Sequence, residues 1–174
     1  MILLAHIKKR IIALLLKREM RRHVEKTVSK PKSINKIGIL MEDNEEITRS
    51  LSRALRSIGF SKDQLHFMMY RSENGSEQPT QISTFSSTDF SYTAHPHEKV
   101  QTFCDKGYDV LINYFTKSNP YLELVSLKTQ TKFRVGFTAL DNRYNDLIFS
   151  LPTEEPKLFC QQMNNYLKRI NSPC

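Results

Sequence analysis

The strongest constraint on the fold is an alternation of short apolar runs with segments in which apolar residues recur at helical spacing. The apolar runs of strand length cover residues 36–41, 65–70, 110–115 and 133–137, with a shorter run at 147–149. Runs that are apolar almost throughout are typical of strands buried on both faces, as in parallel sheets covered by helices. We therefore predict an α/β fold with a three-layer, mostly parallel open sheet of the Rossmann-like or flavodoxin-like kind.

Local signals indicate where the helices between these runs begin and end. Asp43 and Glu46 follow the first run in a capping-type spacing, and Gly59 can adopt the positive φ that ends a helix. Ser118 or Asn119 can cap a further helix after the third run. Each strand is thus expected to be followed by a helix, which is the connection that parallel strands need.

The N-terminal segment is expected to form one long basic helix in front of the sheet. Residues 2 to about 29 contain neither Gly nor Pro, and their apolar residues recur at spacings of three and four. Pro31 and its polar neighbours mark a linker, because a proline forces the preceding residue out of the helical region. We therefore predict a helix and linker over residues 1–32 and an α/β domain over residues 33–174.

The basic character of the chain belongs to this segment alone. The net charge is +8, and the first 32 residues account for all of it, with ten Lys or Arg against two Glu. Electrostatic attraction of a partner is therefore expected from the helix and not from the domain. The side chains predicted to contact an anionic surface are Lys8, Lys9, Arg10, Lys17, Arg18, Arg21, Arg22 and Lys26.

Three functions remain open for this helix. Its apolar stripe can pack on the domain or on a protein partner while the cations stay solvated. Alternatively, the cations can neutralise the phosphates of RNA, for which the ribosome is a natural target. In a third interpretation, Leu and Ile side chains enter the interface of an anionic membrane, although Ile11–Leu16 is far too short to span it. We expect a non-enzymatic accessory or binding protein that this helix tethers to one of these partners.

Polar residues near the carboxyl ends of the strands form a candidate ligand crevice, because ligands bind outside these ends in open α/β sheets. The residues of this candidate crevice are Asn113, Thr116, Ser118, Asp141, Arg143, Asn145 and Asp146. The alternative interpretation of the same residues is that they form caps, turns and surface ion pairs.

No cofactor, metal ion or catalytic residue is expected from the motifs. Acidic residues follow the first strand, where a dinucleotide fingerprint needs glycines, and neither GxxxxGK[ST] nor GxSxG occurs. His95 and His97 have no nearby Cys or acidic residue in a metal-ligand spacing. The three cysteines are odd in number and widely spaced, which favours a reducing, cytoplasmic compartment, with the tether allowing a peripheral place at the membrane.

The stretches YDVLINY (residues 108–114), FRVGF (133–137) and DNRYNDLI (141–148) resemble a small uncharacterised protein family of the Bacteroidota. The basic leading helix and the isolated first strand also match that family, so the resemblance covers nearly the whole chain and implies a domain of unknown function. The succession of YDVLIN, a helix and FRVGF is also similar to part of the acceptor-side domain of heptosyltransferase-like glycosyltransferases. That similarity implies an alternative function, a degenerate or minimal transferase-like enzyme with a sugar or nucleotide site at the strand ends.

Overall fold

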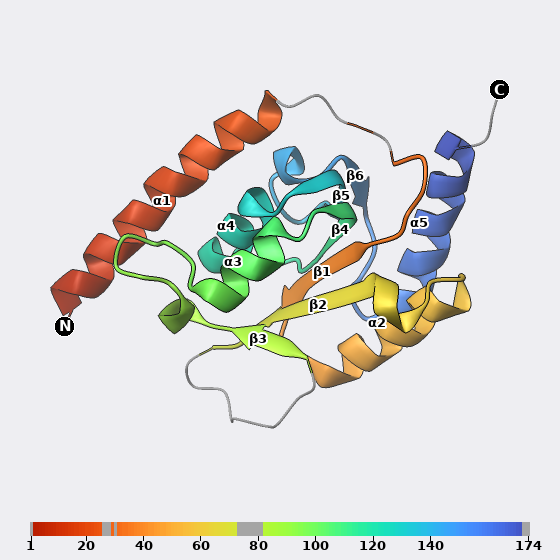
Figure 1. Ribbon diagram of the computed structural model, residues 1–174, viewed down its shortest axis with the longest axis horizontal. Helices are drawn as coiled ribbons and strands as arrows, with labels where there is room; N and C mark the ends of the chain where they lie inside the picture. The colour runs from red at the N-terminus through yellow and green to blue at the C-terminus, as the bar shows by residue number, and fades with distance from the viewer. Residues whose placement is uncertain (1, 26–28, 30, 73–81, 172–174) are drawn as a thin grey trace.

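The computed structural model describes residues 2–25, 29, 31–72 and 82–171, and its core is one six-stranded sheet (Figure 1). All neighbouring strands are parallel, in the order β3-β2-β1-β4-β5-β6. The strands are β1 (Ile37–Glu42), β2 (Leu65–Tyr70), β3 (Ser83–Phe85), β4 (Tyr108–Tyr114), β5 (Thr131–Phe137) and β6 (Leu147–Phe149). The helices are α1 (Ile2–Val24), α2 (Glu45–Ser57), α3 (Glu98–Asp105), α4 (Pro120–Lys128) and α5 (Pro156–Asn171), with 3-10 turns η1 (Lys62–Gln64), η2 (Ser87–Asp89) and η3 (Asn142–Tyr144).

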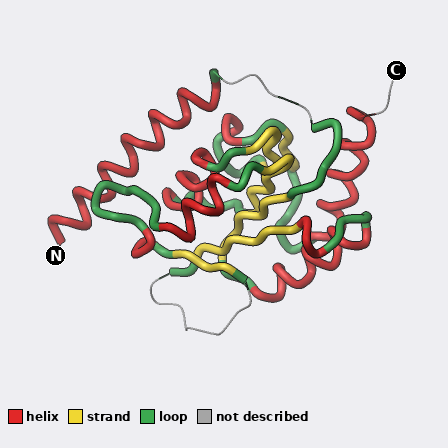
Figure 2. The backbone as a smooth tube through the Cα atoms, viewed as in Figure 1, coloured by secondary structure: helices red, strands yellow, loops and turns green. Residues whose placement is uncertain are grey.

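Helices cover both faces of the sheet and form the predicted layers (Figure 1, Figure 2). α2 and α5 pack together on one face, and α3 and α4 lie on the other face, where α1 packs along α4. Side chains of each strand alternate between the two faces, so that Ile39 joins the core under α2 and α5 while Leu40 joins the core under α3 and α4. The predicted α/β open sheet is therefore confirmed, and it is parallel throughout.

The cap of α2 differs from the prediction by one residue. Asn44 is the N-cap, and its side-chain oxygen accepts the backbone N–H of Ile47 at 3.0 Å. The prediction that Asp43 caps this helix is wrong, because the Asp43 carboxylate pairs instead with Arg71 after β2. An asparagine cap satisfies the same orphan N–H groups of the first turn.

The inner face of α1 is part of the core. Ile12 and Met20 are buried in the cluster that α3 and α4 also line, and Leu16 packs against it. α1 ends at Val24, whereas the predicted helix continues to about residue 29. Residues 26–28 of that prediction lie outside the described part of the chain. The helix therefore packs on the domain through one side and leaves the other side exposed.

The buried side chain of Arg134 links α1, α4 and β5. Arg134 is 3% exposed, and its Nη2 donates to the carbonyl oxygens of Ser126 at 3.3 Å and Thr129 at 2.9 Å, at the C-terminal end of α4. A cation there is favoured by the negative end of the helix dipole. Burial lowers the pKa of Arg134 to about 10, so the guanidinium stays charged at neutral pH. Its Nη1 lies 3.4 Å from Nδ1 of His23, which joins α1 to the same group.

Asp109 fixes the start of β1 against β4. Its Oδ2 accepts the backbone N–H groups of Asn35 at 2.8 Å and Lys36 at 3.1 Å, and its Oδ1 accepts Nζ of Lys132 at 2.7 Å. Burial disfavours the charged carboxylate, but these hydrogen bonds prevail and lower the pKa of Asp109 below its usual value. The charged form is therefore stabilised in the folded chain.

We expect Asp109→Asn to lower the free energy of unfolding at pH 7 by about 1–2 kcal/mol, because hydrogen bonds to a charged acceptor become neutral ones. A carboxyl whose pKa is lowered by folding stabilises the fold above its unfolded pKa of about 4, and this contribution disappears as the pH falls through the folded value. The difference between the two proteins should therefore shrink below about pH 4. Urea denaturation at a series of pH values from 7 downward measures this difference in the free energy of unfolding. Glu154→Gln, at an exposed position, is the control. Equal midpoints for Asp109→Asn and the unmodified protein at pH 7 would contradict this role.

Candidate functional site

The switch point of the sheet lies between β1 and β4, and side chains of the protein contact one another next to it. Beside it, at the ends of β1 and β2, Nε of Arg71 donates to Oδ2 of Asp43 at 2.5 Å. Tyr70 at the end of β2 stacks on Tyr121 at the start of α4, with 5.9 Å between the ring centroids. Phe115, directly after β4, is buried. In doubly wound folds a nucleotide lies at the switch point, so these contacts lie next to the usual ligand position.

Two residues of the predicted crevice meet inside the protein. Asn113 is fully buried and Asn145 is 7% exposed, and Nδ2 of Asn113 donates to Oδ1 of Asn145 at 2.8 Å. Gly136 of β5 makes room for this pair, since a Cβ atom there would lie 2.7 Å from Cγ of Asn145. Within the described part of the chain, Oδ1 of Asn113 and Nδ2 of Asn145 have no hydrogen-bond partner. The pair links β4 to the turn before β6 and is closed to solvent.

Ser118 belongs to a hydrogen-bond cluster around Glu123 of α4. Glu123 is 8% exposed, and its carboxylate accepts hydrogen bonds from Oγ of Ser118 at 2.7 Å, the N–H of Asn119 at 3.1 Å and Oη of Tyr144 at 2.8 Å. Burial, and then the hydrogen bond to this carboxylate, raise the pKa of Tyr144 above its usual value. Asn119, and not Ser118, is the N-cap of α4. Glu123 is not among the predicted site residues, although its place four residues after the Asn119 cap is a usable signal.

The other predicted crevice residues lie in turns. Arg143 donates to the carboxylate of Asp141 through its backbone N–H at 3.0 Å and its Nη2 at 2.6 Å. These hydrogen bonds lower the pKa of Asp141 to about 2. Asp146 accepts the backbone N–H of Arg134 at 2.7 Å, and Thr116 lies half-buried in the loop after β4. All of these contacts are of the kind that shapes turns and helix ends.

The predicted surface-binding residues of α1 separate into two groups. Lys8 points inward, where its Nζ donates to the carbonyl oxygens of Ser87 at 2.7 Å and Phe90 at 2.8 Å. The exposed cations of α1 are Lys9, Arg10, Lys17, Arg18, Arg21 and Arg22. Lys26 lies outside the described residues. Lys8 thus holds the η2 loop in place, and the other six described cations face solvent.

Glu19, whose side chain is only 13% exposed, divides the exposed cations further. Arg18 and Arg22 form ion pairs with the Glu19 carboxylate at 3.1 Å and 3.5 Å. Arg10, Lys17 and Arg21 have no carboxylate within ion-pair distance among the described residues. These three cations project from the outward side of the helix, because they lie at spacings of seven and four residues. They are available to an external anion.

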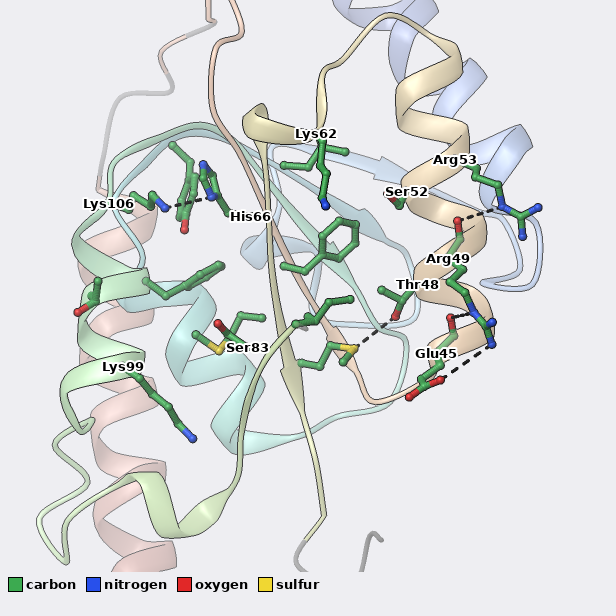
Figure 3. A pocket seen from close by; sticks show the side chains of 18 residues that line it. Glu45, Thr48, Arg49, Ser52, Arg53, Lys62, His66, Ser83, Lys99 and Lys106 are labelled. Atoms are coloured by element: carbon green, nitrogen blue, oxygen red, sulfur yellow. Dashed lines mark hydrogen bonds and ion pairs between the residues drawn. The ribbon is translucent and has the colours of Figure 1, made fainter. Parts of the chain in front are cut away.

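A groove of about 890 Å³ follows the outer edge of β2 (Figure 3). Arg49 and Arg53 of α2 line one side of it, with guanidinium groups that point away from its centre in Figure 3, and Lys99 of α3 and Lys106 directly after α3 line it from the other face of the sheet (Figure 3). These cations come from separate segments, none of which carries a cluster of positive charge, so the groove is not among the sites predicted from the sequence. Its cationic walls suit an anionic ligand.

Several cations of this groove already have partners. Nζ of Lys106 lies 3.0 Å from Nδ1 of His66 (Figure 3), and burial, then the charges of Lys106 and Lys36, lower the pKa of His66. The lowered pKa favours the neutral imidazole, whose Nδ1 can accept this hydrogen bond from Lys106. Lys99 pairs with the Asp89 carboxylate at 2.9 Å. The positive charge of the groove is thus partly compensated within the protein.

A second groove, of about 410 Å³, lies between α1 and η3. Lys17 and Arg21 of α1 line it together with Asp141 and Arg143. The structure therefore brings part of the predicted basic surface next to part of the predicted crevice. Leu16, Met20, Val24, Glu25 and Tyr144 complete its lining.

The comparison with protein families agrees with these structural boundaries. A family of unknown function, DUF6913, matches residues 7–170. The chain belongs to this family. The matched residues run from α1 to α5, so the DUF6913 sequence includes the basic helix as well as the sheet. Neither a curated protein nor a solved structure matches the chain significantly. None of the helices in the described part of this DUF6913 protein has the length and apolar content needed to cross a bilayer.

We expect Gly136→Ala to lower the free energy of unfolding by about 1–3 kcal/mol, because the added methyl group must displace the buried amide of Asn145. Asn145→Ala removes that amide and makes room for the methyl group. The double variant should therefore be little less stable than Asn145→Ala alone, which denaturation midpoints in a double-mutant cycle would show. If the two substitutions are simply additive, the close contact does not explain the glycine.

Proposed function

We propose that this DUF6913 protein is a non-enzymatic accessory or binding protein that docks through the outer face of α1. The surface it binds is anionic, and either RNA on a ribosome or an anionic membrane can supply the negative charge. The proposal rests on one observation: Arg10, Lys17 and Arg21 are exposed and free of carboxylate partners among the described residues, while the inner face of the same helix is buried.

The charge distribution supports this assignment. The first 32 residues carry the whole net charge of +8, and the remaining residues are neutral in sum. A positive field therefore originates at α1 and falls off over a Debye length of about 8–10 Å at physiological salt. Because Ile12 and Met20 anchor the helix to the domain, the cations are presented in a fixed orientation.

The transferase-like alternative has weaker support. It needs an open sugar or nucleotide site at the strand ends, in line with the resemblance to heptosyltransferase-like enzymes. Asn113, Ser118 and Asn145 are instead engaged with other side chains of the protein. A Bacteroidota origin and a cytoplasmic location, peripheral at the membrane, are further parts of the proposal. A protein with an acidic surface is the remaining partner class for α1.

The test is co-sedimentation of the full chain with ribosomes and, separately, with anionic vesicles, at low and high salt. The triple variant Arg10→Gln/Lys17→Gln/Arg21→Gln should weaken association at least about tenfold at low salt, since each cation near an anionic surface contributes about 1 kcal/mol before screening. Point substitutions are preferable to deletion of α1, because deletion would also expose the apolar surface under Ile12 and Met20.

The matched control removes three exposed cations from the opposite side of the sheet, as Arg56→Gln/Lys157→Gln/Arg169→Gln. This control has the same net charge as the test variant, so it separates a local contact from a general charge effect. Equal weakening by both variants, or no association of the unmodified protein with either surface, would rule out docking through α1.

A further inference from the structure

The outer face of α1 is apolar as well as basic. Four large apolar side chains are exposed among the described residues, and three of them lie on α1: Ile7 at 45%, Leu14 at 67% and Val24 at 58%. The inner face of the helix is separately supplied with buried apolar residues such as Ile12 and Met20. The exposed apolar side chains are therefore not needed to hold α1 on the domain.

Leu14 lies at the centre of the exposed cations. Arg10 precedes it by four residues, and Lys17, Arg18 and Arg21 follow it by three, four and seven residues. Residues at these spacings share one face of an α-helix. The outward side of α1 thus carries an apolar centre with a rim of positive charge.

We infer that the anionic surface bound by α1 is a lipid bilayer, with Leu14 inserted among the headgroups and Arg10, Lys17 and Arg21 in contact with lipid phosphates. This inference rests on the proposed docking through α1 and adds the identity of the partner. A helix with a basic rim and an apolar centre lies in the plane of the interface, with its apolar side about 5–10 Å deep. Burial of the Leu14 side chain and attraction of the cations to anionic headgroups then both contribute to the binding free energy.

The same face is less suited to RNA. Contacts to phosphates need cations alone, and they gain nothing from an exposed leucine at their centre. Proteins that bind single-stranded nucleic acid add aromatic side chains on which the bases stack. The α1 sequence, Ile2–Val24, contains no Phe, Tyr or Trp. The composition of the face therefore favours lipid.

A second copy of the chain is also a poor occupant. Two α1 helices meeting through their outer faces would bring Arg10, Lys17 and Arg21 of one copy against those of the other. Like charges that are placed together at an interface oppose association. Anionic lipid supplies both missing complements, negative headgroups for the cations and an apolar layer for Leu14.

The absence of tryptophan from the chain provides a specific probe. Leu14→Trp introduces a single tryptophan at the centre of the face, and Gln161→Trp introduces one at an exposed position of α5. On addition of vesicles of phosphatidylcholine and phosphatidylglycerol, we expect the emission of the Leu14→Trp protein to shift to the blue and to be quenched by brominated acyl chains. The Gln161→Trp protein should show neither change.

A second variant, Leu14→Gln, tests the contribution to binding. We expect it to bind the same vesicles about tenfold more weakly, because a leucine that is mostly exposed in solution loses its burial in the interface. Its binding to ribosomes, measured in parallel, should be unchanged. A conservative Leu14→Met substitution should keep the vesicle affinity.

The outcomes separate the two proposals. Vesicle binding that is lost in the charge variant but unchanged in Leu14→Gln, with no tryptophan shift, overturns insertion and keeps docking on an anionic surface. Binding to ribosomes without binding to vesicles overturns the lipid assignment and identifies RNA. Binding to neither surface overturns docking through α1 itself, and the lipid inference with it.

Discussion

A parallel sheet must be covered on both faces, and this requirement determines the place of α1. Every residue of β4 is buried, and so are the six consecutive residues Leu122–Leu127 of α4. A helix that is buried all round needs neighbours on its outer side as well as the sheet on its inner side. α1 supplies that outer neighbour, with Ile12 and Met20 in the shared core. The basic helix is therefore a structural element and a surface at the same time.

The contact with α4 also orients the exposed side of α1. The guanidinium of Arg134 contacts the last carbonyl groups of α4 and the imidazole of His23, and Nζ of Lys8 holds the η2 loop near the other end of the helix. Polar contacts of this kind are directional, so they fix the rotation of α1 about its axis as well as its position. A fixed rotation decides which apolar side chains face outward. Leu14 is exposed for that reason, and it lies among the cations through which we propose that α1 binds.

The fold could be predicted from the sequence because its signals are local. Strand-length apolar runs predicted five of the six strands with small errors at their ends, the exception being β3, and polar caps indicated helix starts to within a residue, as Asn44 and Asn119 show. The contacts of the candidate site could not be predicted in the same way. Gly136 and Asn145, or Glu123 and Tyr144, are apart in the sequence and meet only through the sheet. The sequence also did not show which apolar residues of α1 face the core and which face solvent, because the residue type is the same in both cases.

The contacts at the strand ends are a structural reason for placing the proposed binding surface on the outside of this fold. In a nucleotide-binding sheet, glycines after the first strand let the backbone approach a phosphate. Here Asp43 follows β1 and pairs with Arg71, and Tyr121 stacks over the neighbouring strand end. Both features remove the space and the positive potential that a phosphate needs at a helix N-terminus. Positive charge is available instead at the β2 groove, where partners within the protein partly compensate it, and on α1, where Arg10, Lys17 and Arg21 lack such partners among the described residues. An external anion gains most from cations that lack a carboxylate partner, and α1 presents Arg10, Lys17 and Arg21 on one outward face, where we propose that it binds.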